Sequence, residues 1–518
     1  MKFDIIYISN HSVTLEIDNN LPFNTDKEYS VYVNDELYKS GVKTNVTSIF
    51  GLKSDSSYKI AVLTDDSRFE KNVKTNHEYV TLNVKRFGAK GDGVSDDTNF
   101  IQCAINACPV SGRVYIPQGV YYVRPLFLKS HITIELAKGA KLLGDTDRNN
   151  YPILPGMLAT TDEKDEFNLG SWEGNPLDCF ASIITGIEVE DVNIIGEGIV
   201  DGNASNSDWW IDVRDKKIAW RPRGMFLVRC KNITAQGITI CNTPSWNLHP
   251  YFSQNIRFID MNVENPKISP NTDGCDPESC KNVDIIGVNF SVGDDCIAVK
   301  SGKIYMGKTY KTPSEKFNIR NCSMNFGHGA IVLGSEMAGG IKDFVISKCL
   351  FNQTDRGLRI KTRRGRGKDA VIDGITFDNI KMNKVLTPLV INMFYYCDPD
   401  GKSEYVWSKK ALPVDERTPY LGHFVFKNMD CQNVNVAAGT FYGLPEMPIE
   451  SIELENINFT YDPQAKEGVA AMMTGCEPMK NRGFIFYNVK HVSMKNVILP
   501  DFVKDDIERT NVIDFKQN

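Results

Sequence analysis

The chain repeats a short pattern in which Asn or Asp stands just before a run of alternating apolar residues. Asn232-Ile233, Asn255-Ile256 and Asn282-Val283 follow one another at intervals of 23 and 27 residues, and Asp191-Val192 precedes them. Periods of roughly 20 to 50 residues are typical of solenoids, in which each repeat contacts only its neighbours. Asn between strands suits tight turns with a left-handed backbone. The pattern therefore predicts a parallel β-helix with coils about 4.8 Å apart.

The pattern continues on both sides of these repeats. Apolar residues at helical spacing follow Ser95, from Phe100 to Ala107, and predict a capping helix over about residues 96–108, with Ser95 or an adjacent Asp as its N-cap. Strand-like runs begin the series at 114–117 and 132–136. Later coils are expected to begin near Phe317, Lys342, Val371, Phe424, Ile452 and Val492.

Residues 1–78 have a different organisation, with short β-rich runs at 12–17, 29–33 and 58–62 separated by turn residues. The segment from Leu52 to Tyr58 resembles a tyrosine corner, and the module resembles a fibronectin type III domain. We therefore expect an all-β chain: a small fibronectin III-like β-sandwich over 1–78, then a right-handed parallel β-helix over 79–518. The first module lacks a cluster of ionisable residues, so a spacer or substrate-orienting role is expected there.

Composition narrows the choice of partner. The formal net charge of −6 argues against nucleic acid, although an acidic polymer remains possible if positive charge is local. Ser9, Asn10 and His11 interrupt the apolar N-terminus, so neither a secretory signal nor a membrane span is expected. The expected location is the cytoplasm, and secretion or a periplasmic location applies only to a processed chain.

The 13 scattered cysteines predict free buried thiols, and neither a metal nor a cofactor is expected. The oligomeric state is left open.

Four polar signatures interrupt the β-rich region at roughly coil-length intervals. They are Asn271-Thr272-Asp273-Gly274, Gly293-Asp294-Asp295-Cys296, Gly327-His328-Gly329 and Arg359-Ile360-Lys361. Residues one coil apart are neighbours in space, so these ionisable side chains should converge on one outer surface.

Strand alternation complicates the second signature. If Ile297 and Val299 face inward, strict alternation would also turn Asp295 inward, where an unpaired carboxylate is costly. We therefore expect a bend at Gly293 to Cys296 that exposes both carboxylates. Arg359 and Lys361 share one parity and can reach the same cleft without distortion.

This set of groups matches glycoside hydrolysis. An inverting mechanism needs one protonated carboxyl and one carboxylate that activates water, roughly 6.5 to 9.5 Å apart. Crowded carboxylates raise the pKa of one member and keep an acid protonated near neutral pH. Arg and Lys suit a sugar that carries its own carboxylate.

The four signatures resemble those of the polygalacturonases, glycoside hydrolase family 28, over about residues 80 to 500. The resemblance implies that Asp294 is the general acid and that Asp273 and Asp295 position and activate the attacking water. It implies that His328 supports the acid and that Asn271 helps to hold the site. Arg359 and Lys361 would bind the galacturonate carboxylate, and a cleft tyrosine would be Tyr395 or Tyr396. The implied reaction is inverting cleavage of α-1,4-galacturonosyl linkages in pectin.

Exo action is favoured over endo action. Irregular segments at 155–178, 203–223 and 397–421 are long enough to wall off one end of a groove, and residues 244–250 resemble bacterial exopolygalacturonases. Two alternative functions are a calcium-dependent, pectate-type lyase and a noncatalytic β-helix that binds carbohydrate.

The basic run 363–368 is either a solvated turn or a guide for anionic polymer. Four tryptophans are expected in the core, with one of them able to stack on sugar: Trp209, Trp210, Trp220 and Trp246.

Overall fold

The first seven strands form two small antiparallel sheets in a computed structural model that describes residues 1–158 and 168–517. The sheets have the strand orders β1-β2-β5 and β4-β3-β6-β7. The strands are β1 (Phe3–Ile8), β2 (Val13–Ile17), β3 (Asn24–Val33), β4 (Glu36–Thr44), β5 (Val46–Ile49), β6 (Ser57–Thr64) and β7 (Ser67–Lys74). Their facing apolar side chains form one buried cluster, and the Lys53 amide donates to Tyr58 Oη at 2.7 Å. The small sandwich is confirmed, and this contact is the one expected of a tyrosine corner. The boundary at residues 78 and 79 stays a prediction.

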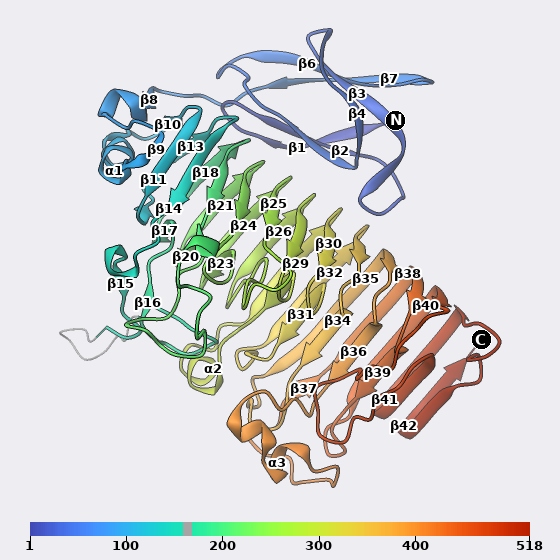
Figure 1. Ribbon diagram of the computed structural model, residues 1–518. Coiled ribbons are helices and arrows are strands. Elements are labelled where there is room, and N and C mark those ends of the chain that lie inside the picture. Colours follow the sequence, from blue (N-terminus) through green and yellow to red (C-terminus); the bar gives the residue numbers. More distant parts are fainter. Residues whose placement is uncertain (159–167, 518) are drawn as a thin grey trace.

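The rest of the chain winds into a parallel β-helix, which confirms the predicted fold (Figure 1). Its strands form three rows, and successive members of a row pair in parallel, except between β23 and β28 of row three, where Cys275 and Glu278 bridge the two strands. Row one contains β8 (Thr81–Asn83), β10 (Gly112–Ile116), β13 (Ile132–Leu136), β18 (Glu190–Gly196), β21 (Lys231–Gln236), β24 (Gln254–Ile259), β26 (Lys281–Ile286), β29 (Ser314–Arg320), β32 (Ile341–Ser347), β35 (Val371–Asn383), β38 (His423–Val434) and β40 (Ile449–Tyr461).

Rows two and three complete each coil. Row two contains β9 (Asp92–Asp96), β11 (Gly119–Val123), β14 (Ala140–Gly144), β19 (Ile199–Asp201), β22 (Thr239–Cys241), β25 (Asn262–Glu264), β27 (Asn289–Val292), β30 (Ser323–Phe326) and β33 (Leu350–Asn352). Row three contains β12 (Leu126–Phe127), β17 (Ile184–Ile187), β20 (Met225–Val228), β23 (Leu248–Tyr251), β28 (Ile297–Val299), β31 (Ile331–Gly334), β34 (Arg356–Lys361), β36 (Thr387–Asn392) and β39 (Ala437–Tyr442). The last strands, β41 (Arg482–Ile498) and β42 (Ile507–Gln517), run through two rows.

The repeated Asn residues form the predicted ladder at the second residue of consecutive row-one strands. Asp191, Asn232, Asn255 and Asn282 all have positive φ, between 55° and 57°. Each amide donates to the residue one coil earlier: Asn232 to Asp191 at 2.8 Å, Asn255 to Asn232 at 2.8 Å, and Asn282 to Asn255 at 2.9 Å. The left-handed turn and the amide chain explain why Asn recurs at this position.

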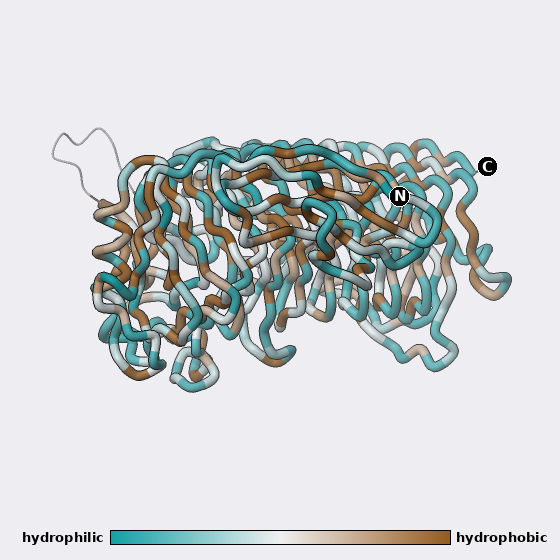
Figure 2. The backbone as a smooth tube through the Cα atoms, turned by 90° about the horizontal axis from the view of Figure 1, so that it is seen from above, coloured by the Kyte–Doolittle hydropathy of each residue, from teal (hydrophilic) through white to brown (hydrophobic). Residues whose placement is uncertain are grey.

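The apolar interior is continuous from the first coil to the last, and a helix closes its N-terminal end. Helix α1 (Thr98–Ala107) buries Ile101, Ala104 and Ile105 against that interior, within the predicted range 96–108. Asp96 accepts a hydrogen bond from the Thr98 amide at 3.0 Å. Figure 2 shows the apolar and polar segments alternating along each coil.

Shorter elements project from the coils on the side away from the sandwich (Figure 1). They are β15 (Ile153–Leu154), β16 (Cys179–Phe180), α2 (Ile304–Tyr310) and α3 (Glu404–Trp407), which follows the turn η4 (Pro399–Lys402). Strand β37 (Tyr420–Leu421) instead pairs in parallel with the start of β35 in row one. Three further single turns are η1 (Val84–Phe87), η2 (Arg148–Asn150) and η3 (Ala204–Asn206).

The sandwich lies along row one and contacts several coils (Figure 1). Tyr7 Oη donates to Asn193 on β18 at 2.7 Å, and Arg257 on β24 donates to the Ile6 carbonyl at 2.8 Å. Glu16 accepts two hydrogen bonds from Arg320 on β29, at 2.8 and 3.0 Å. The first module is therefore fixed to the β-helix across coils that are far apart in sequence.

All 13 cysteines are unpaired, as the sequence predicted, and most of them are buried. Cys103 and Cys397 are exposed, and Cys241 and Cys476 are partly exposed. Among the described residues, no helix is long and apolar enough to cross a membrane.

We expect Asn255→Ala to lower the thermal midpoint more than Asn255→Gly does. Both changes remove the amide from the ladder, but only Ala must keep a Cβ in a left-handed conformation that costs roughly 1–2 kcal/mol. Thermal unfolding of the two variants measures the difference. An equal loss in both would mean that the backbone conformation contributes nothing at this turn.

Candidate active site

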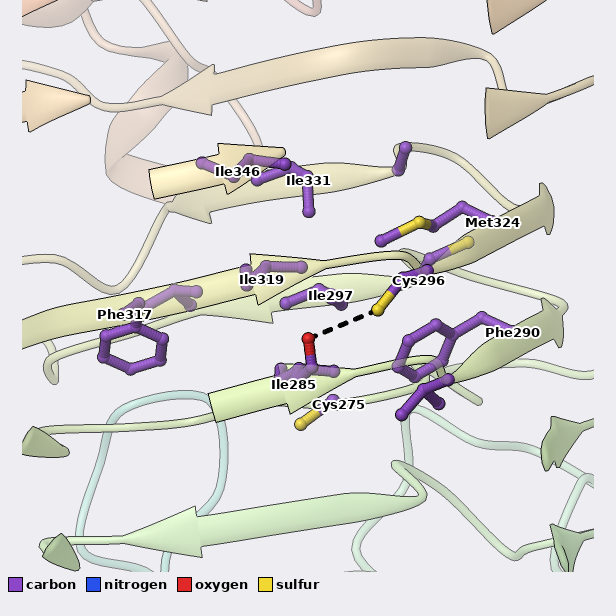
Figure 3. Packing of buried hydrophobic residues seen from close by; sticks show 14 of the residues in the cluster. Cys275, Ile285, Phe290, Cys296, Ile297, Phe317, Ile319, Met324, Ile331 and Ile346 are labelled. Atoms are coloured by element: carbon purple, nitrogen blue, oxygen red, sulfur yellow. Dashed lines mark hydrogen bonds between the residues drawn. The ribbon is translucent and has the colours of Figure 1, made fainter. Parts of the chain in front are cut away.

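The site begins at a bend between rows two and three, where Gly293 to Cys296 connect β27 to β28. Cys296 and Ile297 are both buried in the interior, so two consecutive residues face inward (Figure 3). The break in alternation that the sequence required is therefore present. It leaves Asp294 partly exposed, but Asp295 is only 2% exposed, so the expectation that both carboxylates are exposed is wrong for Asp295. Asp295 can be buried there because Lys361 and Arg359 are its partners.

Backbone pairing aligns the signatures on consecutive coils. The Gly274 amide donates to the Asp295 carbonyl at 3.0 Å, and the Cys296 amide donates to the Gly329 carbonyl at 2.8 Å. Arg359 and Lys361 on β34 pair in register with β31. The predicted arrangement on adjacent coils is confirmed.

Three carboxylates converge at this place. One oxygen from each of Asp273, Asp294 and Asp295 lies within 4.8 Å of the others. This spacing between nearest oxygens is shorter than the roughly 6.5 to 9.5 Å expected for an inverting pair of carboxyl groups. The reason is that the Gly293 bend brings Asp294 and Asp295 onto the same turn.

Asp295 is held in its ionised form. Lys361 Nζ lies 2.8 Å from its Oδ2 and Arg359 Nη1 lies 3.2 Å from its Oδ1. Burial alone would favour the neutral acid, but Lys361 and Arg359 keep the pKa of Asp295 below its usual range. Both cations therefore contact a carboxylate of the protein itself.

Asp294 has the opposite tendency. Burial raises its pKa, the charge of Asp295 raises it further, and His328 opposes both. The His328 ring nitrogen Nδ1 lies 2.9 Å from Asp355, and this contact raises the pKa of His328 against its partial burial. A proton donor and an ionised carboxylate thus stand side by side.

Asp273 is the third member, and a buried charged group lies behind it. Burial, Asp276 and Asp294 raise the pKa of Asp273 well above its usual range. Lys300 Nζ lies 3.4 Å from Asp276 and 3.5 Å from Glu336. These carboxylates hold Lys300 charged even though burial favours the neutral amine.

Asn271 is held by Arg221, a residue that sequence reasoning missed. Arg221 donates to Asn271 Oδ1 at 2.5 Å and to the carbonyl of Pro270 at 3.2 Å. It comes from the irregular segment 203–223, and no repeat position marks it. Asp355, Asp276 and Glu336 were also missed, although the outward parity of Lys300, the residue after β28, was a usable signal.

Of the two candidate tyrosines, Tyr395 lies next to Lys361. Its ring centroid lies 5.8 Å from Lys361 Nζ, and the ring is buried. Tyr396 is partly exposed, and its backbone packs against Gly401 instead.

Irregular segments cover row three on one side of the carboxylates. Trp172 stacks between Trp220 and Trp246, with centroid distances of 4.9 and 5.5 Å. This stack joins the described parts of two predicted wall segments, 155–178 and 203–223, to the coil before Asp273. Residues 159–167 of the first segment lie outside the described residues. Trp209 packs against Tyr151 and Phe180, so Trp209 and Trp246 are core residues as expected.

The basic run 363–368 does not fit either of its two predicted roles. Arg364 is buried and pairs with Glu446 through two hydrogen bonds, at 2.5 and 2.8 Å. Arg363 and Arg366 both contact Asp398, from the third irregular segment. These three cations fix the loop 397–421 onto the coils: Arg363 and Arg366 through Asp398, and Arg364 through the carbonyls of Tyr405, Ser408 and Lys410.

Within residues 1–158 and 168–517, two groups of side chains have spacing that suits a cation: Asp273, Asp294 and Asp295, and separately His131, Glu190 and Asp191. In the first group, Arg359 and Lys361 already neutralise Asp295 and would compete with a metal ion. The second group is partly exposed on row one, away from the carboxylate site.

Comparison with known proteins identifies the family. Residues 129–410 match a family model described as "Glycosyl hydrolases family 28". This chain belongs to glycosyl hydrolase family 28. The family 28 enzyme is therefore a glycosidase. Its residues 81–164 also match a model described as "Rhamnogalacturonase A/epimerase, pectate lyase-like".

Similar proteins to this family 28 member include a "Probable polygalacturonase" of Vitis vinifera, 31% identical over 392 residues that cover 74% of each chain. The "Exo-poly-alpha-D-galacturonosidase" of Dickeya chrysanthemi is 28% identical and covers 69% of this chain and 65% of its own. A solved "Family 28 Exopolygalacturonase" of Yersinia enterocolitica covers 100% of this chain and 98% of its own, with a TM-score of 0.68 and 20% identity. This last likeness shows the shared fold.

We expect Lys300→Met to destabilise the family 28 enzyme by about 3–5 kcal/mol, because it removes the buried cation that lies between Asp276 and Glu336. Chemical unfolding measures the loss. The double variant Lys300→Met/Asp276→Asn serves as the control and should recover part of it. A Lys300→Met protein as stable as the wild type would show that these charges are not coupled.

Proposed function

We propose that this enzyme hydrolyses the α-1,4-galacturonosyl linkages of polygalacturonate and its oligomers, with inversion and from the chain end. The observation that carries the proposal is the contrast between Asp294 and Asp295. One carboxyl is biased toward its protonated form, and its neighbour is held ionised by Lys361 and Arg359. Asp294 is therefore the general acid, and Asp295 is the base for water.

The short spacing of the carboxylates supports direct attack by water. Two oxygens up to 4.8 Å apart can both accept hydrogen bonds of about 2.8 Å from one water molecule. Asp273 and Asp295 can hold a water in this way while Asp294 donates its proton to the leaving oxygen. A nucleophilic carboxylate is disfavoured because Asp295 is already bound to two cations.

Positive charge next to the carboxylates supports an anionic sugar. Lys361 has three N–H donors and Arg359 has five, so each retains donors after it contacts Asp295. Arg356 lies on the same strand and adds a third cation, partly exposed. A galacturonate carboxylate would bind to these donors beside Tyr395.

Closure of the groove supports exo action. The stack of Trp172, Trp220 and Trp246 fills row three on the side of the coils before Asp273. Glu173 follows in the same segment, and its carboxylate lies 4.0 Å from Lys303, which also contacts Asp398. Packed segments at this place would block the passage of a polymer and favour the entry of a chain end. Names of both kinds, exo and endo, occur among similar proteins, and endo action is the alternative.

Two other classes are weaker. A calcium-dependent lyase would need Asp295 to exchange its two cationic partners for a metal ion. A noncatalytic binding protein would not need an acid and a base with opposed pKa shifts. A lyase would make an unsaturated, ultraviolet-absorbing product that disappears with chelator.

The variant Asp294→Asn should fold normally and lose at least about 1,000-fold in kcat on oligogalacturonates, because the amide cannot donate a proton to the leaving oxygen. Reducing-end assays measure turnover, and thermal unfolding checks the fold. Asp284→Asn, on row one of the same coil, is the matched control and should retain full activity. Near-normal turnover of Asp294→Asn would refute the mechanism.

Products followed over time test the mode of action. On polygalacturonate, we expect one small product to accumulate from the first time point, whereas a spread of intermediate lengths would establish endo action. Proton NMR of the first product should show the β-anomer, since inversion at an α-linkage forms it. An initial α-anomer would mean retention.

A further inference from the structure

A hollow lies close to the catalytic carboxylates, between residues 210–215 and the turn 266–270. Its volume is about 710 Å³, several times that of one sugar unit. The turn 266–270 separates this hollow from the catalytic bend. A side chain at Gly293 would collide with the carbonyl oxygens of Ser269 and Pro266, so turn and bend are in direct contact.

Both walls of the hollow are held in place. Trp210 Nε1 donates to the Thr243 carbonyl at 3.2 Å, which fixes the ring on one side. On the other side, Lys267 Nζ lies 3.2 Å from the ring centroid of Phe326, and Ser269 Oγ donates to the Pro266 carbonyl at 2.6 Å. The hollow is therefore a shaped feature of the fold.

The lining has the chemistry of a site for an uncharged sugar. Trp210, Val213 and Ile268 give it apolar faces, and Ile268 is 94% exposed. Apolar and aromatic faces pack against the C–H groups of a sugar ring. The carboxylates of Asp212 and Asp215 accept hydrogen bonds from hydroxyl groups.

The charge of the hollow contrasts with that of the catalytic site. Two carboxylates and one guanidinium, Arg214, line it, so its balance is negative. The catalytic site presents Arg359 and Lys361. An ionised galacturonate is therefore attracted to the catalytic site and repelled from the hollow.

We propose that this hollow is an accessory subsite for an uncharged sugar unit of the substrate. The unit is either a methyl-esterified galacturonosyl residue or a neutral side-chain sugar. The proposal rests on the galacturonan hydrolase function proposed above and adds that uncharged units in the chain improve binding next to the catalytic turn.

The test compares three oligogalacturonates of equal backbone length: unesterified, with one methyl ester, and with one neutral sugar branch. In the full-length enzyme, Trp210→Ala should lower kcat/KM about fivefold to tenfold on an oligomer that carries an uncharged unit, through KM. The same variant should change kcat/KM on the unesterified oligomer less than twofold. Ile268→Ala should act in the same direction, and Ile513→Ala, at another exposed isoleucine on β42, is its matched control.

A second variant guards against misfolding of Trp210→Ala. Asp212→Asn/Asp215→Asn removes the negative balance and should reduce the preference for uncharged over unesterified oligomers. A selective loss with the methyl ester or with the branch supports the subsite and identifies its ligand. Equal losses on all three substrates, or an unchanged preference in every variant, overturn it. If the wild type hydrolyses none of the three, the proposed function itself fails.

Discussion

Parallel pairing between successive coils is the constraint on which the rest of this structure depends. It places residues that are 20 to 60 positions apart at strand-to-strand distance. Asp273, Asp295, His328 and Arg359 become neighbours through backbone hydrogen bonds alone. The site therefore depends on the correct register of every coil between them, together with the bend at Gly293 and the contact of Arg221 with Asn271.

The electrostatics of the site follow from this packing. Three carboxylates in one place would repel one another, and two cations from β34 stabilise only one of them. The remaining two are left with raised pKa values. One cluster thus contains an acid and a base at the same pH, which is what hydrolysis of a glycosidic bond requires.

The coil positions, the Asn ladder and the bend at Gly293 could all be predicted from sequence, because each is a local pattern repeated at a known period. The bend was predictable because a buried, unpaired Asp295 would have been too costly. Arg221 and the Trp172 stack could not be predicted, since they come from segments that lack a period. The basic run 363–368 was misread for the same reason: its carboxylate partners, such as Asp398 and Glu446, lie in distant loops. The shorter spacing of the carboxylates also depended on the conformation of a turn.

The contact between Glu16 and Arg320 has a further consequence for how the chain assembles. These residues are 304 positions apart. During synthesis, the sandwich emerges long before the coil that contains Arg320. Until that coil is made, the face of the sandwich that binds it stays exposed to solvent. Once docked, it ties together coils that otherwise contact only their immediate neighbours. A stack that would fray one coil at a time from its ends is thereby made to open as a larger cooperative unit.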